Sequence, residues 1–222
     1  MNAFGKTVRK LILLTAALIL CCGCAGKAPA AAGTAQTGVM SGDYRDFPVS
    51  DASIFTIGPS GTGAEITGCK RDIKDKVIVV PERIGGADIV AIGPGAFTET
   101  GHVEAIVLPD SVKTIGDSAF TGLEDLKFVY FGSGLRSTGN MMFNYCPALE
   151  KIELPDGTER INGYLAVRCA GLKEVVVPAS VTKIEGRMLE PFDFDGVVRT
   201  PSGSEAEKNA LEAGIKVENT AD

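Results

Sequence analysis

The sequence predicts a solenoid, a stack of short coils that share one core, and three observations support this prediction. The segment at residues 103–125, VEAIVLPDSVKTIGDSAFTGLED, recurs three more times at a fixed spacing of 23 residues. Apolar residues occupy the same positions in each copy, and a proline or glycine follows the first apolar segment of every copy. A fixed period of this length is typical of stacked supersecondary units, because one coil cannot bury its apolar side alone.

Six apolar columns define the repeat across its four copies. Only 45% of the chain is apolar, yet Thr138 and Thr158 are the two polar exceptions among these positions, so the pattern is far from chance. The columns hold Val103, Leu126, Leu149 and Leu172; Ile106, Val129, Ile152 and Val175; Leu108, Phe131, Leu154 and Val177; Val112, Leu135, Thr158 and Val181; Ile115, Thr138, Ile161 and Ile184; and Phe120, Phe143, Ala166 and Leu189.

Each copy has the same internal order of elements. Residues 103–108 alternate as a short strand with one buried face, and Pro109 ends the strand because proline cannot donate to a ladder. A second short apolar pair follows at residues 112–115. A Gly-Asp-Ser turn then leads into Ala119 and Phe120, which we expect to form a helical turn on the convex side. Strands of adjacent coils would form a parallel sheet along one side.

The segment IVLPDSVKTIGDSAF at residues 106–120 resembles the BspA-like leucine-rich repeat family of bacterial surface proteins. Cys146 and Cys169, also 23 residues apart, stand where that family often has a cysteine before the next leucine. The resemblance extends from about residue 54 to the C-terminus. It implies an α/β fold: a right-handed leucine-rich-repeat solenoid of about five 23-residue coils, with a parallel sheet on one side. It also implies surface exposure and adhesion to host or matrix proteins.

Some positions depart from the family pattern. Gly132, Thr138 and Asn162 replace the expected residues, so we expect the middle coils to be less regular. The family pattern contains no catalytic residues, and none carries over to this chain.

The N-terminus indicates export. Residues 1–23 are interpreted as a signal peptide, because basic residues precede an apolar run at 11–22 that is shorter than the ~20 residues a spanning helix needs. The tripeptide that follows, Gly23, Cys24 and Ala25, resembles a bacterial lipoprotein box. It predicts that Cys24 becomes the lipidated N-terminus, with several acyl chains giving stable membrane anchoring. The alternative is an ordinary secretory signal with incidental cysteines, since Leu20 lies at position −4.

Residues 24–50 are interpreted as the lipidated N-terminus and a flexible tether. Their composition of Ala, Gly, Thr and Ser offers too little large apolar surface for a core. A helix in the alanine run is the alternative, which Pro29, Gly33 and Gly38 oppose. The leucine-rich repeat domain with its caps then spans residues 51–222.

Caps are predicted at both ends of the stack. At the N-terminal end, residues 53–57 and 65–68 pair as a β-hairpin around a loop at 58–63. A first repeat strand follows at 77–80, with an insertion of five residues near 85–88. At the C-terminal end, we expect a strand at 196–200, a helix to about Ala213 and a closing strand at 215–217.

Specific capping residues support the C-terminal helix. Ser204 and Glu207 form a capping box at its start, and Gly214 follows its end. Such a terminal cap shields the last apolar coil.

Charge excludes some partners. The net charge is −6, and removal of Lys6, Arg9 and Lys10 with the signal peptide would take it to −9. No basic stripe suited to nucleic acid is present, and an anionic membrane surface would repel the chain.

Catalytic and metal chemistry find little support. The single histidine, His102, is interpreted as a solvated loop residue, and no Ser-His-Asp set or His/Cys metal cluster can be assembled. Asp193 and Asp195 could bind calcium, but no loop of spaced oxygen ligands follows, so an acidic turn is favoured. We expect no catalytic site, no metal site and no cofactor.

Besides the predicted lipidation site Cys24, the cysteines Cys69, Cys146 and Cys169 remain after export. Equivalent positions on adjacent coils lie ~4.8 Å apart if coils stack as strands do, so Cys146 and Cys169 are within Cα reach of a disulfide. Side chains of one column usually point the same way, however, and buried cysteine behaves as a small hydrophobe. The core interpretation is favoured, and Cys69 has no evident partner.

The strand face is the candidate binding surface. If the apolar column of residues 126–131 points inward, Phe128 and Tyr130 point outward on the concave sheet, beside Lys151 and Glu153. An aromatic pair next to an ion pair is the composition of an interface centre. The alternative is that the aromatic residues pack under a loop or are isolated apolar residues.

The leading hypothesis is a non-enzymatic, lipid-anchored surface module of the cell envelope that binds a protein or glycan through the repeat sheet. The alternative is a structural or assembly component of the envelope without an external ligand. A small hydrolase is disfavoured, because no nucleophile–base set is present.

Overall fold

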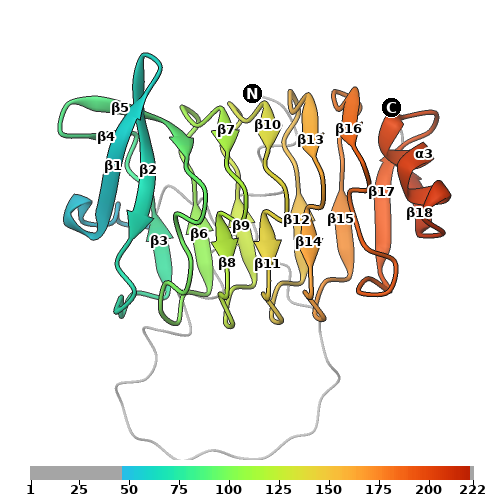
Figure 1. The fold of residues 1–222 in the computed structure, drawn as a ribbon, viewed down its shortest axis with the longest axis horizontal. Coiled ribbons are helices and arrows are strands. Elements are labelled where there is room, and N and C mark those ends of the chain that lie inside the picture. Colours follow the sequence, from blue (N-terminus) through green and yellow to red (C-terminus); the bar gives the residue numbers. More distant parts are fainter. Residues whose placement is uncertain (1–46, 221–222) are drawn as a thin grey trace, which may run out of the picture. The chain divides into compact units, whose positions relative to one another are not determined.

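The computed structural model describes residues 47–220, and the fold is that of the unit Val49–Asp222. The predicted signal peptide, the lipidation site Cys24 and nearly all of the tether lie outside the described residues. Coils stack side by side from the blue end to the red end of the ribbon (Figure 1). No helix among residues 47–220 is long and apolar enough to cross a membrane.

Three ladders of parallel strands run along the stack, and each coil contributes at most one strand to a ladder. The first ladder holds β3 (Val77–Val79), β6 (Ala105–Val107), β9 (Phe128–Tyr130), β12 (Lys151–Glu153), β15 (Glu174–Val176), β17 (Val197–Pro201) and β18 (Lys216–Thr220). The second holds β5 (Ala87–Ile92), β7 (Thr114–Ile115), β10 (Ser137–Thr138), β13 (Arg160–Asn162) and β16 (Lys183–Glu185). The third holds β8 (Phe120–Thr121), β11 (Phe143–Asn144) and β14 (Ala166–Val167).

The predicted leucine-rich-repeat solenoid is confirmed, with about seven turns in place of about five. The number is larger because β17 and β18, expected as a cap, continue the first ladder in parallel register. An edge strand has unpaired backbone groups, and added turns satisfy them.

The prediction of a helical turn at Ala119 and Phe120 is wrong. Phe120 instead begins β8, and it pairs in register with Phe143 of the next coil. Parallel pairing is therefore not confined to one side of the stack. In-register coils satisfy their backbone hydrogen bonds with each other, so a helical turn is not needed there.

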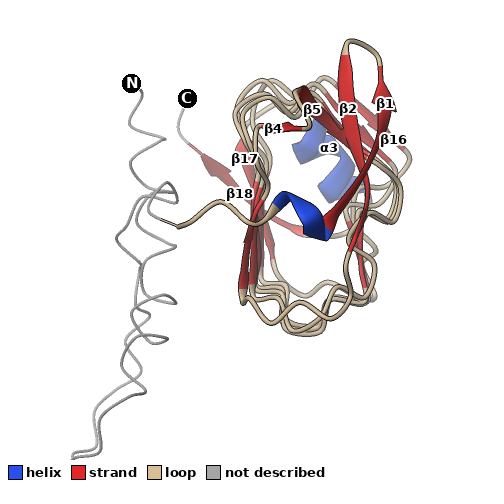
Figure 2. Cartoon of the chain, turned by 90° about the vertical axis from the view of Figure 1, so that its left-hand side faces the viewer, coloured by secondary structure: helices blue, strands red, loops and turns tan. Residues whose placement is uncertain are grey.

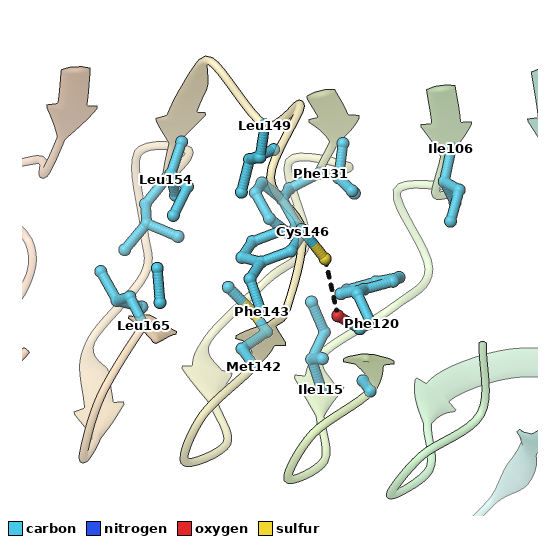
Figure 3. Packing of buried hydrophobic residues seen from close by; sticks show 14 of the residues in the cluster. Ile106, Ile115, Phe120, Phe131, Met142, Phe143, Cys146, Leu149, Leu154 and Leu165 are labelled. Atoms are coloured by element: carbon cyan, nitrogen blue, oxygen red, sulfur yellow. Dashed lines mark hydrogen bonds between the residues drawn. The ribbon is translucent and has the colours of Figure 1, made fainter. Parts of the chain in front are cut away.

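The apolar columns meet in one core between the ladders (Figure 3). Phe97, Phe120 and Phe143 come from successive coils and stack, with ring centroids 5.5 and 5.2 Å apart. The two polar exceptions, Thr138 and Thr158, are fully buried in the same columns. The coils therefore keep their shape and accommodate these two polar residues in the core.

An antiparallel hairpin covers the N-terminal end. It consists of β1 (Phe55–Ser60) and β2 (Gly63–Cys69), preceded by the short 3-10 helix η2 (Ala52–Ile54). The loop predicted for residues 58–63 is too long, because the strands pair as far as Ser60 and Gly63. Pro59 is tolerated since β1 is an edge strand, where a missing N–H costs little.

The predicted insertion near residues 85–88 is a second hairpin. The strand β4 (Arg83–Ile84) pairs antiparallel with the start of β5. Gly85 and Gly86 form the turn with φ of +59° and +88°. Two consecutive positive φ angles match the twist of a two-residue hairpin, and glycine adopts them without strain.

The helix of the predicted C-terminal cap forms as expected. The helix α3 (Glu205–Glu212) begins after Ser204, whose hydroxyl accepts from the Glu207 N–H at 3.1 Å. Its inward side presents Ala206 and Ala210, both fully buried. Seen along the stack, α3 lies at the far end of the superimposed coils (Figure 2).

Candidate functional site

The outer side of the first ladder carries the predicted binding residues. Inward residues such as Ile106 and Ile152 enter the core, so their strand neighbours face outward. We call these outward rows the outer face. One row is Val77, Ala105, Phe128, Lys151, Glu174, Val197 and Lys216; the other is Val79, Val107, Tyr130, Glu153, Val176, Arg199 and Glu218.

The N-terminal half of the outer face is apolar and aromatic. Phe128 and Tyr130 are half-buried, and they pair in register with Ala105 and Val107 of the preceding coil. Those two smaller residues are buried although they belong to the outward rows. The aromatic side chains therefore lie next to buried apolar residues, and neither is an isolated exposed ring.

The C-terminal half is a continuous ion-pair network. The Lys151 ammonium lies 2.9 Å from Glu153 and 3.1 Å from Glu174. The Arg199 guanidinium continues the network, 3.5 Å from Glu174 and 2.8 Å from Glu218. Lys216 closes it at 3.3 Å from Glu218. Cations and carboxylates alternate, so the network carries no excess of either sign.

The network holds its charges in place. Burial favours the neutral form of Lys151, but the carboxylates of Glu153 and Glu174 outweigh it and raise the pKa of that ammonium. Lys151 and Glu153 thus form the expected ion pair, although within one strand and shared with Glu174. Arg199 is a site residue that was not predicted, although its place 23 residues after Val176 puts it in the same outward row.

The first ladder is divided between the two halves. Strands β3, β6 and β9 form one sheet, and β12, β15, β17 and β18 form another. Just before this division, Gly132 departs from the repeat because a Cβ there would lie 2.3 Å from the Pro109 carbonyl oxygen of the preceding coil. The aromatic pair of β9 and the ion pair of β12 therefore lie on either side of the junction of two sheets.

A row of alternating charge borders the outer face. Glu104 accepts hydrogen bonds from Lys127, at 2.8 Å, and from Lys76. These bonds hold the pKa of the Glu104 carboxyl below its usual value. Farther along the same row, Lys173 pairs with Asp195 at 2.8 Å. Opposite charges on neighbouring coils favour this stacking register over a shifted one.

The other candidate residues do not assemble a reactive centre. The His102 side chain is 91% exposed and lies 2.7 Å from Asp125. Asp193 accepts from the Arg168 N–H at 3.3 Å, while Asp195 pairs with Lys173, so the two carboxylates serve separate partners. Within residues 47–220, no group of three or more His, Cys, Asp or Glu residues is placed to hold a metal ion.

The cysteines are free thiols in the described domain. Cys146 is buried and donates to the Phe120 carbonyl at 3.2 Å (Figure 3). Cys169 points the same way, toward the Phe143 carbonyl at 3.9 Å. The neighbouring Cys169 thiol, together with burial, raises the pKa of Cys146. Burial raises the pKa of Cys69 to about 12. The raised pKa values make Cys146 and Cys69 poor nucleophiles.

Comparison with known proteins agrees with the fold. A leucine-rich repeat protein of T. pallidum has a solved structure with 28% identity and a TM-score of 0.60, covering 68% of this chain and 71% of that chain. A leucine-rich cell surface protein of Faecalibacterium prausnitzii A2-165 has 21% identity and a TM-score of 0.51. The alignment covers 75% of this chain but 38% of the F. prausnitzii chain.

No curated protein matches the sequence. The family model described as the BspA type leucine rich repeat region matches residues 90–212 with six copies. That match covers more than half of the chain, and it includes the apolar columns from which the repeat was predicted. The chain belongs to the BspA-type leucine-rich repeat family.

Proposed function

We propose that this protein is an exported, lipid-anchored module that binds a protein or glycan at the cell surface through its outer face. Leucine-rich repeat domains generally bind protein partners and are generally non-enzymatic. The observation that carries the proposal is the half-buried pair of Phe128 and Tyr130 beside the ordered network that begins at Lys151. Aromatic residues are enriched at interface centres, and polar and charged residues surround them at the rim.

Binding draws on the rigidity of the stack. Each outer-face residue stands on a strand that pairs with at least one neighbouring coil, so little conformational entropy is lost when a partner docks. The aromatic half supplies apolar contact area. The charged half supplies specificity, because a partner must match a fixed pattern of alternating signs.

The test uses the unit Val49–Asp222 and its Phe128→Ala/Tyr130→Ala double variant. Both are immobilised and exposed to host extracellular matrix proteins and to an envelope extract of the source cell. We expect a captured partner to bind the double variant at least about tenfold more weakly. The control is Leu211→Ala, which removes an exposed apolar side chain on α3 and should leave affinity unchanged.

The outcomes separate the alternatives. A matrix partner that is lost in the double variant supports adhesion. A single fixed partner from the cell's own envelope supports the assembly component instead. Equal binding by the parent and the double variant would remove the outer face from consideration.

Anchoring has its own test. The motif Gly23-Cys24-Ala25 supports Cys24 as the acceptor of a diacylglycerol, because a thiol is the group modified in lipoprotein boxes of this type. In the source cell, Cys24→Ser should abolish incorporation of labelled palmitate and release the protein from the membrane fraction. Cys22→Ser, inside the predicted signal peptide, is the matched control and should retain the label. Equal labelling of both variants would contradict the proposal.

A further inference from the structure

The first ladder has one covered edge and one open edge. At its N-terminal end, Ser50 covers the edge of β3: the Ser50 N–H donates to the Val79 carbonyl, and the Val79 N–H donates to the Ser50 hydroxyl, both at 3.0 Å. At its C-terminal end, the five residues of β18 pair with β17 on one side (Figure 1). No other strand within residues 47–220 pairs with the second side. An open edge of this kind can accept another strand.

The register of the ladder determines which backbone groups face the open edge. The Val177 N–H donates to the Arg199 carbonyl at 2.9 Å, so the backbone groups of this outward residue face the preceding coil. Glu218 is aligned with Arg199 in the same parallel register, and its backbone groups therefore face β17. Because these directions alternate along a strand, the N–H and C=O groups of Val217 and Asn219 point to the open edge.

Opposite charges lie on either side of Val217. The side chains of Lys216 and Glu218 are 71% and 40% exposed, and they end the ion-pair network of the outer face. The order of cation, apolar residue and anion is complementary to itself when the strand is reversed. An antiparallel copy centred on Val217 places Lys216 of each copy opposite Glu218 of the other, so two opposite-charge pairs form.

Charge also selects this register over the neighbouring ones. In the centred register, the two Val217 residues exchange their N–H and C=O groups, and Lys216 and Glu218 occupy the adjacent positions, where opposing side chains lie closest. A shift of two residues in either direction keeps the backbone bonds possible. It places Lys216 opposite Lys216 or Glu218 opposite Glu218, however, and like charges directly opposite each other are destabilising.

We propose that two copies of this chain associate through β18, antiparallel about Val217, as a two-fold symmetric dimer. The first ladders of the two copies then form one continuous sheet. Opposing residues of an antiparallel pair lie on the same face, so both outer faces point the same way. The interface is small and the association therefore weak. The proposal does not depend on what the outer face binds.

Sedimentation velocity of the unit Val49–Asp222, which contains the three ladders and both caps, tests the association. We expect the parent to change from monomer to dimer between about 1 μM and about 1 mM. Lys216→Glu and Glu218→Lys each place like charges opposite one another at both pairs, so each should weaken dimerisation at least about tenfold. Lys183→Glu, the same charge reversal on the second ladder, is the matched control and should dimerise as the parent does.

Mixing the two variants tests the register itself. In an equimolar mixture of Lys216→Glu and Glu218→Lys, the glutamates of one copy lie opposite the lysines of the other. The mixture should therefore recover dimers that neither variant forms alone. Such recovery also shows that both variants are folded, because a misfolded edge could not pair.

Amide hydrogen exchange provides a second readout. The Val217 N–H faces the open edge in the monomer, so its exchange should slow as the concentration of the parent rises. In Lys216→Glu it should stay fast at every concentration. A parent that remains monomeric up to about 1 mM, equal dimerisation of the parent and both charge variants, or a mixture without recovered dimers would each overturn the proposal.

Discussion

Thr138 and Thr158 occupy apolar columns, are both fully buried, and differ in one hydrogen bond. The Thr158 hydroxyl donates to the Pro155 carbonyl at 2.8 Å. The Thr138 hydroxyl finds no partner within the described domain, although Thr138 is aligned with Ile161 of the next coil. A buried hydroxyl without a partner loses its bonds to water and gains none in return.

Valine at these two positions should therefore have opposite effects. Thr138→Val should raise the free energy of unfolding by about 1 kcal/mol, since it replaces an unsatisfied hydroxyl with a methyl group. Thr158→Val should lower it by about 1 kcal/mol, because it removes a satisfied bond and leaves the Pro155 carbonyl with one fewer donor. Urea denaturation of both variants measures the difference. Changes of the same sign would contradict this account.

The row of alternating charge that borders the outer face forms a rim, and it stabilises the stack in a pH-dependent way. Glu104 is held between Lys127 and Lys76, and the pKa of its carboxyl is lowered from 4.5 in the folded state. A carboxyl whose pKa is lower in the folded than in the unfolded state stabilises the protein at pH values above the unfolded pKa. That contribution is lost as the pH falls through the folded pKa. The stabilisation by Glu104 should therefore be complete above pH 4.5 and decline below it.

The variant Glu104→Gln tests this pH dependence. At pH 7 the free energy of unfolding of this variant should be about 1 kcal/mol lower than that of the parent, which is the upper end of the range for partly exposed ion pairs. The difference from the parent should shrink as the pH is lowered from 5 to 3. Glu150→Gln, on the same rim but exposed, is the control and should follow the parent curve. A constant gap between Glu104→Gln and the parent at every pH would rule out the charge as the cause.

Most strands of the first ladder were predictable because their signal is a column of large apolar residues that repeats. The elements that were mispredicted depend on contacts between coils. Phe120 is part of the strand β8 because Phe143 of the next coil pairs with it. No local feature of Ala119 and Phe120 indicates that pairing. The same holds for residues 58–60, which lengthen β1 because β2 lies opposite.

The candidate site shows the same limit. Alternation alone placed Phe128, Tyr130, Lys151 and Glu153 on the outward rows, because side chains of a strand alternate between faces. Which ions pair was beyond the sequence, since Lys151 reaches Glu174 across a coil boundary.

At the scale of the whole described unit, stability depends on its ends. Each coil contacts only its neighbours, so a terminal coil exposes apolar surface unless a cap covers it. Asn209 of α3 fixes this cap: its side chain accepts from the Met188 N–H at 3.1 Å and donates to the Gly186 carbonyl at 2.7 Å. Met188 and Leu189 beneath the cap are fully buried.

Opening this cap should destabilise the unit and make it associate. Ala210→Glu places a carboxylate at a fully buried position of α3, which should cost about 3 kcal/mol or more and detach the helix from the last coil. The exposed coil should then bind a hydrophobic dye and form larger species as concentration rises. Leu211→Glu, one residue along on the exposed side of α3, is the matched control and should remain monodisperse with an unchanged midpoint. If both variants behave like the parent in light scattering and in urea, α3 does not protect the end of the stack, and the last coil must be stable without it.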